Sequence, residues 1–219
     1  RPVGRAILQA AEVPVAAPSG NTSGRPSPTT AAHMAEDMDG RIDAIVDGGP
    51  CSVGVESTIV DLTETPPRLL RPGGITLEQL ESVLGRVEVD QAVTRLMSAG
   101  EKPRAPGMKY RHYAPKAPVT VVAGPPERTA EHIARSLTPG DGVICFDEFA
   151  GEFPGCQIQR MGPAGDKSAQ ARHIFDALRA FDHTEVPRIW AQCPDPSGLG
   201  LAINNRLNKA AGFHIVEVK

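Results

Sequence analysis

Apolar and polar positions in the second half of the chain follow two alternating spacings. Short runs rich in valine and isoleucine predict β-strands at 119–123, 142–146, 188–193 and 214–218, with 157–161 as a weaker candidate. Between these runs, apolar residues recur at helical spacing in 126–137, 168–181 and 199–212. Strands that alternate with helices in this way predict a parallel sheet flanked by helices.

Residues 118–219 are therefore expected to fold as a small Rossmann-like α/β domain, about the size of an ordinary single domain. The first predicted strand is followed by "VAGPPE" (122–127) and not by a G-x-G-x-x-G loop. The sequence therefore predicts no dinucleotide at this position.

The first 98 residues have a different sequence pattern, with shorter apolar runs between stretches rich in Gly, Pro, Ser and Thr. The apolar runs predict strands at 13–18, 42–47 and 54–62. A helix is expected at 27–38, with Ser27 as its N-cap. A second helix is expected at 76–85, where Thr76 is a good N-cap and Gly85 a good stop.

The composition is that of an ordinary globular protein without a strong excess of either charge. Of the 219 residues, 40% are hydrophobic and 22% are charged, which suits one large domain or two small ones. The net charge of -3 provides no general attraction to nucleic acid or to an anionic membrane. A bound anion would therefore have to be held by a local group of residues.

Other sequence features predict the cellular setting. No apolar run approaches the roughly 18 residues that a membrane-spanning helix needs, and no signal peptide is recognised. The four cysteines form no C-x-x-C pair, so we expect reduced thiols in a cytoplasmic protein without a zinc site. The chain begins "RPVGRAILQA", without Met and already in a helical pattern, so an N-terminal part of the parent protein is expected to be missing.

The densest polar stretch is "APSGNTSGRPSPTT" at 17–30, between a predicted strand and a predicted helix. Its hydroxyl and amide side chains, its glycines and the N-terminus of the following helix would suit a phosphate group. The alternative is a surface loop that ends in an ordinary helix cap. No G-K-[ST] follows, so the stretch is not a Walker A loop.

Two further positions are candidates for facing a ligand, and each also has an ordinary explanation. Ser57 lies inside the apolar run "VGVESTIVDL". Its hydroxyl would either face a ligand or bond a neighbouring backbone group, with Glu56 and Asp61 facing solvent. Arg71 lies at a strand end before a Pro-Gly-Gly turn, where it would bind phosphate in a bidentate manner or remain a solvated rim charge.

Residues 99–117 read as a linker, yet they are rich in functional side chains. Both tyrosines of the chain, Tyr110 and Tyr113, lie here together with Lys109, Arg111 and His112. This segment would either close over a bound nucleotide as a lid or be an ordered linker that its tyrosines anchor.

Four motifs in a fixed order together resemble one family. They are SxNxSGxxSPTT, DGG with a following VGVESTIVD, LRPGGIT and PGMKYRHYAP. This order is similar to that of the long, two-domain form of threonylcarbamoyl-AMP synthase, and NRLNKAA resembles part of its second domain. The resemblance implies an α/β fold made of a truncated YrdC-like domain (1–98), a linker across the cavity (99–117) and the Rossmann-like domain (118–219).

The resemblance also implies a reaction. L-threonine, bicarbonate and ATP would be condensed to threonylcarbamoyl-AMP and pyrophosphate, which makes the protein a nucleotidyltransferase. The product would feed threonylcarbamoyladenosine modification of tRNA by a downstream tRNA-modifying transferase, and some affinity for double-stranded RNA or tRNA is implied. Mg²⁺ is expected with the ATP, and no covalent nucleophile is implied because positioning and charge neutralisation suffice.

Site residues follow from the same resemblance. ATP would be contacted by Ser19, Asn21, Ser27, Arg71, Tyr110 and His112. L-threonine would be bound by Ser57 and by the backbone at Ala17. No catalytic nucleophile and no metal ligand are implied.

The chain departs from the family pattern in two ways. Gly20 stands where the family usually has Ala, and the family's basic ATP-binding cluster and threonine-carboxylate arginine are expected before residue 1. The chain alone would then be an inactive fragment of the synthase. A YrdC-like module that binds nucleotide or RNA without synthesis remains the alternative, whereas a carbamoyltransferase-type enzyme would need His-rich zinc motifs that the sequence lacks.

Overall fold

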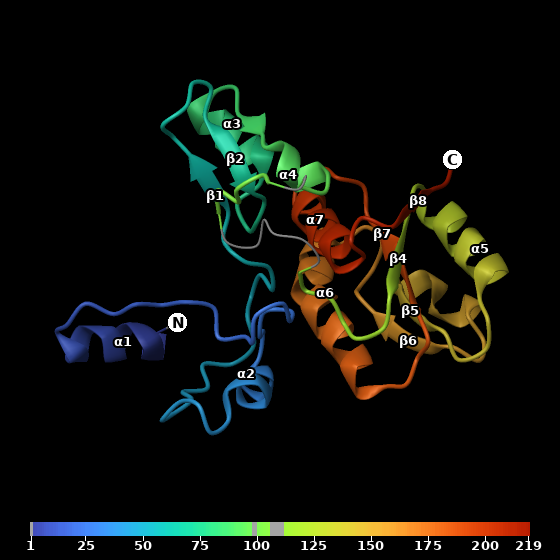
Figure 1. Cartoon of the computed structure of the whole chain (residues 1–219), viewed down its shortest axis with the longest axis horizontal. Coiled ribbons are helices and arrows are strands. Elements are labelled where there is room, and N and C mark those ends of the chain that lie inside the picture. The colour runs from blue at the N-terminus through green and yellow to red at the C-terminus, as the bar shows by residue number, and fades with distance from the viewer. Residues whose placement is uncertain (1, 98–99, 106–111) are drawn as a thin grey trace.

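The computed structural model describes residues 2–97, 100–105 and 112–219 (Figure 1). A three-stranded sheet forms within residues 2–97, which we call the first unit. A five-stranded sheet forms within residues 112–219, which we call the second unit. The α/β fold class expected from the sequence is confirmed.

The second unit is a parallel sheet with strand order β6-β5-β7-β4-β8. Its strands are β4 (Val119–Ala123), β5 (Gly142–Cys145), β6 (Gln157–Arg160), β7 (Ile189–Cys193) and β8 (Ile215–Glu217). Its helices are α5 (Pro126–Ser136), α6 (Lys167–Ala180) and α7 (Gly200–Ala210), with short 3-10 helices at Asp147–Glu152 and Phe181–His183. The strands and helices predicted for this part of the chain are confirmed.

Both faces of this sheet are buried, which explains its continuous apolar strands. Val121 of β4 packs in one core with residues of α6 and α7, whereas Val122 packs in a second core with Ile133 of α5. Successive side chains of a strand point to opposite faces, so neighbouring residues serve different cores. The second unit therefore has three layers, with α5 on one side of the sheet and α6 and α7 on the other (Figure 1).

The first unit has less regular structure. Strand β1 (Ile59–Asp61) runs antiparallel to β2 (Arg68–Arg71), and β2 runs parallel to β3 (Glu88–Val89). Its helices are α1 (Pro2–Ala11), α2 (Ala31–Met38), α3 (Leu77–Leu84) and α4 (Gln91–Thr94). The helix predicted at 76–85 is confirmed, with Thr76 and Gln79 in a capping box and Gly85 at its end at φ 73°.

The strand predictions in the first unit are largely wrong. Residues 13–18 and 42–47 form no strand, and the predicted strand at 54–62 is reduced to β1. Val13 is 62% exposed and Val46 is 59% exposed. A strand depends on hydrogen bonds to a neighbouring strand, and none of the described strands pairs with either segment. The apolar pattern is present in both segments without the pairing that would make a strand.

The start of helix α2 also differs from the prediction. The helix begins at Ala31, and its N-cap is Thr30, whose side chain accepts a hydrogen bond from the His33 N–H at 3.2 Å. Ser27, the predicted cap, instead donates its hydroxyl to Glu56 at 2.7 Å. A hydrogen bond to an ionised carboxylate is stronger than one between neutral groups. The hydroxyl of Ser27 is therefore used in the bond to Glu56 and does not cap the helix.

Helices α6 and α7 form the side of the second unit that faces the first unit (Figure 1). Gly54, at φ 81°, packs so closely on α6 that an added Cβ would lie 2.2 Å from the Ala171 carbonyl oxygen. Asn205 of α7 donates its side-chain N–H to the Val93 carbonyl at 2.8 Å. The two units are therefore in direct contact through these helices.

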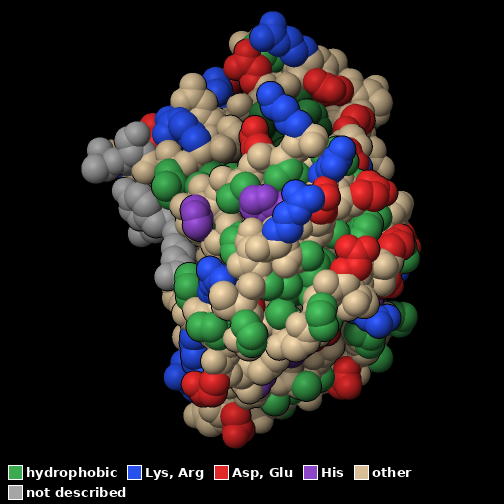
Figure 2. Space-filling model, turned by 90° about the vertical axis from the view of Figure 1, so that its right-hand side faces the viewer, with side chains coloured by type: hydrophobic (Ala, Val, Ile, Leu, Met, Phe, Trp, Pro, Cys, Tyr) green, Lys and Arg blue, Asp and Glu red, His purple; other side chains and the backbone are tan. Residues whose placement is uncertain are grey.

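Charges of both signs are interspersed over the face of the molecule shown in Figure 2. This distribution agrees with the small net charge and shows no large single-sign patch on that face. Among the described helices, none combines the length and the apolar character that crossing a membrane requires.

Candidate functional site

A cavity of about 640 Å³ lies where the first unit meets the start of the second. Its lining comes from the polar stretch at 17–30, the segment before β1, the end of β2 and the start of the second unit. The lining residues are Ala17, Pro18, Ser19, Asn21, Ser23, Ser27, Glu56, Ser57, Arg71, His112 and Tyr113. Its volume and mixed polar lining are those of a small-molecule site.

Arg71 enters this cavity from the end of β2. Its Nε donates to the Ser57 carbonyl at 3.1 Å, and its Nη2 donates to the Ser57 hydroxyl at 3.2 Å. Burial, with a further contribution from the charge of Arg206, lowers the pKa of Arg71 from its ordinary value. A guanidinium in this setting remains charged and presents its other N–H groups to a ligand.

The Pro-Gly-Gly turn after β2 fixes the distance between Arg71 and Ser57. A Cβ on Gly73 would lie 2.2 Å from the Glu56 carbonyl oxygen and 2.5 Å from the Thr58 nitrogen. Both are backbone atoms, so no side-chain rotation relieves the overlap. Gly73 is therefore required for the close approach of these two segments.

Glu56 does not face solvent, contrary to one expectation from the sequence. Its carboxylate accepts hydrogen bonds from Ser27 at 2.7 Å and from Arg206 of α7 at 2.7 Å. Burial opposes the ionisation of Glu56, but the charge of Arg206 and these hydrogen bonds outweigh it, so the pKa of Glu56 lies below its ordinary value. Asp61 is also paired, with Arg104.

Tyr113 and His112 close the cavity from the side of the second unit. Tyr113 is only 1% exposed, packs against Phe175 of α6 and has the Arg206 guanidinium 5.4 Å from its ring centre. Burial raises the pKa of Tyr113 to about 12. Burial also lowers the pKa of His112. Both side chains are therefore neutral near pH 7, and Tyr113 acts as an anchor in the core of the second unit.

Seven of the eight site residues that the sequence predicts line this one cavity: Ala17, Ser19, Asn21, Ser27, Ser57, Arg71 and His112. The eighth, Tyr110, lies outside the described residues. The ligand that each residue contacts stays a prediction.

The predicted site lacked four lining residues and one supporting residue. Pro18, Ser23, Glu56 and Tyr113 line the cavity, and Arg206 supports it from behind. The sequence carried a signal for two of them, because Tyr113 lies in the linker motif PGMKYRHYAP and Ser23 lies in the serine-rich stretch at 17–30. Nothing in the sequence marked Glu56 and Arg206 as a pair, because 150 positions separate them.

The charge around the cavity is positive on balance. Arg71, Arg206 and Lys209 lie within electrostatic reach of one another and are opposed by Glu56. Burial, together with the charges of Arg206 and Arg71, lowers the pKa of Lys209 to about 8. An added anion would relieve this repulsion, so the cavity suits a polyphosphate.

Binding of inorganic tripolyphosphate is expected to weaken as the pH rises through about 8, because Lys209 then loses its proton. The loss should reach up to about tenfold between pH 7 and pH 9, since an anion binds the protonated form more tightly. Titration calorimetry at the two pH values measures it. A Lys209→Arg variant stays charged, so it should show only the pH dependence that comes from the titration of tripolyphosphate itself. A pH dependence of the unsubstituted chain that matches that of the variant would contradict the prediction.

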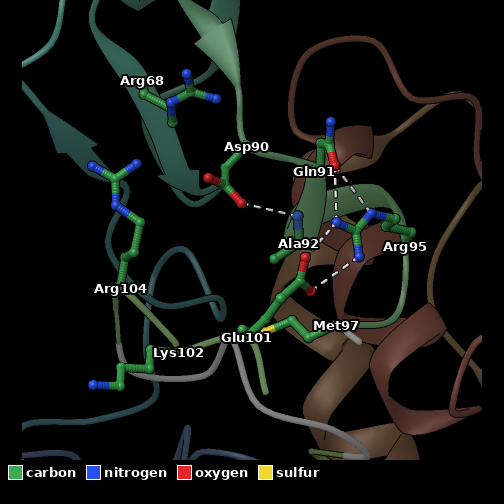
Figure 3. A pocket seen from close by; sticks show the side chains of 9 residues that line it. All are labelled: Arg68, Asp90, Gln91, Ala92, Arg95, Met97, Glu101, Lys102 and Arg104. Atoms are coloured by element: carbon green, nitrogen blue, oxygen red, sulfur yellow. Dashed lines mark hydrogen bonds and ion pairs between the residues drawn. The ribbon is translucent and has the colours of Figure 1, made fainter. Parts of the chain in front are cut away.

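A second cavity, of about 230 Å³, lies beside β2 and α4 (Figure 3). Several basic side chains line it, but its arginines are engaged: Arg68 with Glu64, Arg95 with Glu101 and Arg104 with Asp61. These pairs leave little positive charge for an anion. The larger cavity is the better candidate site.

No group of three or more His, Cys, Asp or Glu side chains among the described residues could hold a metal ion. Within the large cavity, Glu56 is the lining carboxylate, and it is already bonded to Ser27 and Arg206. The described residues therefore do not provide an acidic cage for Mg²⁺.

The fold and the cavity define an α/β protein with a polar cavity where its first unit meets the start of its second, of a charge that suits an anion. Residues 75–212 match the family described as threonylcarbamoyl-AMP synthase, C-terminal domain, and residues 1–73 match the family described as telomere recombination. The chain belongs to the threonylcarbamoyl-AMP synthase family.

Individual relatives agree with this assignment. The threonylcarbamoyl-AMP synthase of Bacillus subtilis is 45% identical over 98% of this chain and 62% of its own length. That of Schizosaccharomyces pombe is 38% identical over 96% of this chain and 55% of its own length. The crystal structure of Pyrococcus abyssi Sua5 complexed with L-threonine superposes with a TM-score of 0.84 at 40% identity, covering 100% of this chain and 64% of that one. The chain thus spans less than two thirds of the length of these relatives.

Proposed function

We propose that the protein to which this chain belongs is an L-threonylcarbamoyladenylate synthase, a nucleotidyltransferase that uses L-threonine, bicarbonate and ATP. The observation that carries the proposal is that seven of the eight residues implied by the family resemblance line one positively charged cavity. The relatives' identity as threonylcarbamoyl-AMP synthases, and the threonine bound in the P. abyssi structure, support the same reaction class.

The two substrates would lie side by side in this arrangement. Ser57 and the backbone at Ala17 would bind L-threonine, whereas Ser19, Asn21, Ser27, His112 and Tyr110 would contact ATP. Arg71 would connect the two sites, because its guanidinium already bonds the Ser57 hydroxyl at 3.2 Å. Such proximity is what a carbamate attack on the α-phosphorus requires.

Catalysis would then consist of positioning and charge neutralisation. The threonine amine and bicarbonate would first form a carbamate with loss of water. The carbamate oxygen would then form a bond to the α-phosphorus while the bond to the pyrophosphate oxygen breaks, and pyrophosphate would leave with the electron pair. Arg71 would stabilise the charge that develops on the phosphate oxygens. The described residues offer no acidic cage, so we propose that Mg²⁺ arrives with ATP as part of the substrate, held by phosphate and water oxygens.

The cellular role follows from the product. Threonylcarbamoyl-AMP would be consumed by a transferase that modifies tRNA, and the reaction would take place in the cytoplasm. Affinity for tRNA or double-stranded RNA remains part of the proposal, to be measured by its salt dependence.

The synthase reaction predicts a strict co-substrate requirement. Pyrophosphate release from ATP, by the protein as its gene encodes it, should occur at a substantial rate only when threonine and bicarbonate are both present. A coupled pyrophosphate assay with each substrate omitted in turn tests this. Release that does not change without threonine would disprove the synthase, and tight RNA binding without pyrophosphate release would favour a binding module.

A further inference from the structure

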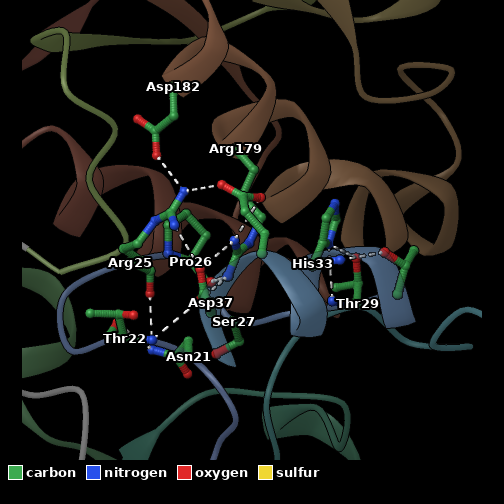
Figure 4. Close-up of polar contacts among 12 residues, drawn as sticks. Asn21, Thr22, Arg25, Pro26, Ser27, Thr29, His33, Asp37, Arg179 and Asp182 are labelled. Carbon is green, nitrogen blue, oxygen red and sulfur yellow. Dashed lines mark hydrogen bonds and ion pairs between the residues drawn. The ribbon is translucent and has the colours of Figure 1, made fainter. Parts of the chain in front are cut away.

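A buried ion pair joins the second unit to the polar loop at residues 19–27 (Figure 4). Arg179, on α6, is 2% exposed, and its Nη2 lies 2.7 Å from Oδ2 of Asp37 on α2. A second bond joins Arg179 Nη1 to the other carboxylate oxygen at 3.1 Å. The pair is therefore bidentate and excluded from water.

Each member of this pair also holds one end of the loop. Asp37 accepts a hydrogen bond from the Thr22 N–H at 3.2 Å, and Arg179 donates to the Pro26 carbonyl at 2.5 Å. Between these points, Asn21 spans the loop by donating to the Arg25 carbonyl at 3.2 Å. These three bonds fix the backbone that carries the cavity-lining side chains of Asn21, Ser23 and Ser27.

The charge of this cluster is nearly balanced. Arg25 adds a second guanidinium to Asp37 at 2.7 Å and also meets Glu36 and Asp182. Burial opposes the ionisation of Asp37, but the hydrogen bonds and charge of Arg179 outweigh it and lower its pKa. Asp37 is therefore ionised near neutral pH.

A buried ion pair of this kind is a poor means of stabilising a fold. Removing two charges from water costs about as much as their attraction returns, so well-packed apolar residues often do as well or better. What the pair provides, and an apolar pair would not, is a set of directional bonds to the loop backbone at Thr22 and Pro26. The ion pair therefore contributes to the conformation of the loop more than to the stability of the fold.

We propose that Arg179 and Asp37 are positioning residues that hold the loop at 19–27 in its ligand-binding form, so that the second unit is part of the nucleotide site. The proposal rests on the proposed function of this loop as the segment that contacts ATP. It assigns a task to the second unit: α6 orders a binding loop that belongs to the first.

Three variants separate positioning from simple stabilisation. Arg179→Met leaves the buried Asp37 with Arg25 as its charged partner, and Asp37→Leu leaves the buried Arg179 with Glu36 at 3.5 Å. Each variant removes the bidentate partner of a buried charge, so both should lower the melting temperature. The double variant Asp37→Leu with Arg179→Met removes both charges and should recover most of the lost melting temperature. The loop backbone would still lack its bonds at Thr22 and Pro26 in the double variant.

Hydrogen exchange and ATP kinetics of the double variant distinguish a positioning role from a purely structural one. Amide hydrogen exchange at Thr22 and Arg25 should be at least about tenfold faster than in the unsubstituted protein. The KM for ATP should rise about tenfold, with a smaller change in kcat. If loop protection and KM both return to normal along with the melting temperature, the pair is merely structural and the proposal is overturned.

A matched control lies in the same unit. Arg188 pairs with the buried Asp141 at 2.9 Å, and neither residue lines the cavity. Arg188→Met should lower the melting temperature without changing exchange at Thr22 and Arg25; faster loop exchange in this control would count against the proposal. Hydrogen exchange needs no enzymatic activity. It therefore still tests the positioning role if the protein neither binds ATP nor makes the adenylate.

Discussion

An Arg71→Ala variant, in the protein as its gene encodes it, is expected to lose about 30- to 1,000-fold in kcat/KM for threonylcarbamoyl-AMP synthesis. That loss corresponds to roughly 2 to 4 kcal/mol, the usual effect of removing one donor that stabilises charge in a transition state. The guanidinium also holds Ser57 through two hydrogen bonds. The KM for threonine should therefore rise together with the loss in ATP use.

Arg68 supplies the matched control for this experiment. It lies at the other end of the same strand, pairs with Glu64 and Glu88 and does not line the large cavity. Arg68→Ala should leave the kinetics nearly unchanged. Unaltered kinetics in the Arg71→Ala variant would remove Arg71 from the site. An equal loss in both variants would mean that the strand and not the guanidinium is responsible.

Replacing Glu56 by Ala is expected to lower the free energy of unfolding by about 3 to 5 kcal/mol. Its partner Arg206 is 0% exposed, so the substitution leaves a buried guanidinium without its counter-charge. The variant also frees the Ser27 hydroxyl, which donates to Glu56 at 2.7 Å. Equilibrium urea unfolding measures the first effect, and the KM for ATP reports the second.

The pH dependence of stability gives an independent check on Glu56. The pKa of its carboxyl is lower in the folded protein than in the unfolded chain, so the unfolded chain binds the extra proton as the pH falls. Its stabilisation is complete above the ordinary pKa of a glutamate and is lost as the pH falls through the lower, folded value. The Glu56→Ala variant should show a weaker acid dependence than the unsubstituted protein. An identical dependence would contradict the assignment.

Glu81→Ala is a suitable comparison, because Glu81 lies on the exposed surface of α3. Its removal leaves no buried charge unpaired and should change the urea midpoint little. A loss as large as that of Glu56→Ala would show that the ion pair with Arg206 is not the cause.

The accuracy of the predictions follows from how each segment is stabilised. The central strands β4, β5 and β7 of the second unit are buried on both faces, so each appears in the sequence as a mainly apolar run. Segments 13–18 and 42–47 carry a similar pattern but form no strand, because strand formation depends on a pairing partner as well as on apolar side chains. The capping box at Thr76 was predictable because all its bonds are made within four residues.

The sequence by itself determined the parallel sheet of the second unit, the helix at 76–85 and seven of the eleven residues that line the cavity, because spacing and short motifs encode these locally. Only the tertiary structure decided that Glu56 is buried against Arg206 and that Arg179 reaches Asp37. Those pairs join residues 150 and 142 positions apart, and no local pattern records such a distance. Their charges are held together by the packing of α6 and α7 on the first unit, which arises only once the whole chain has folded.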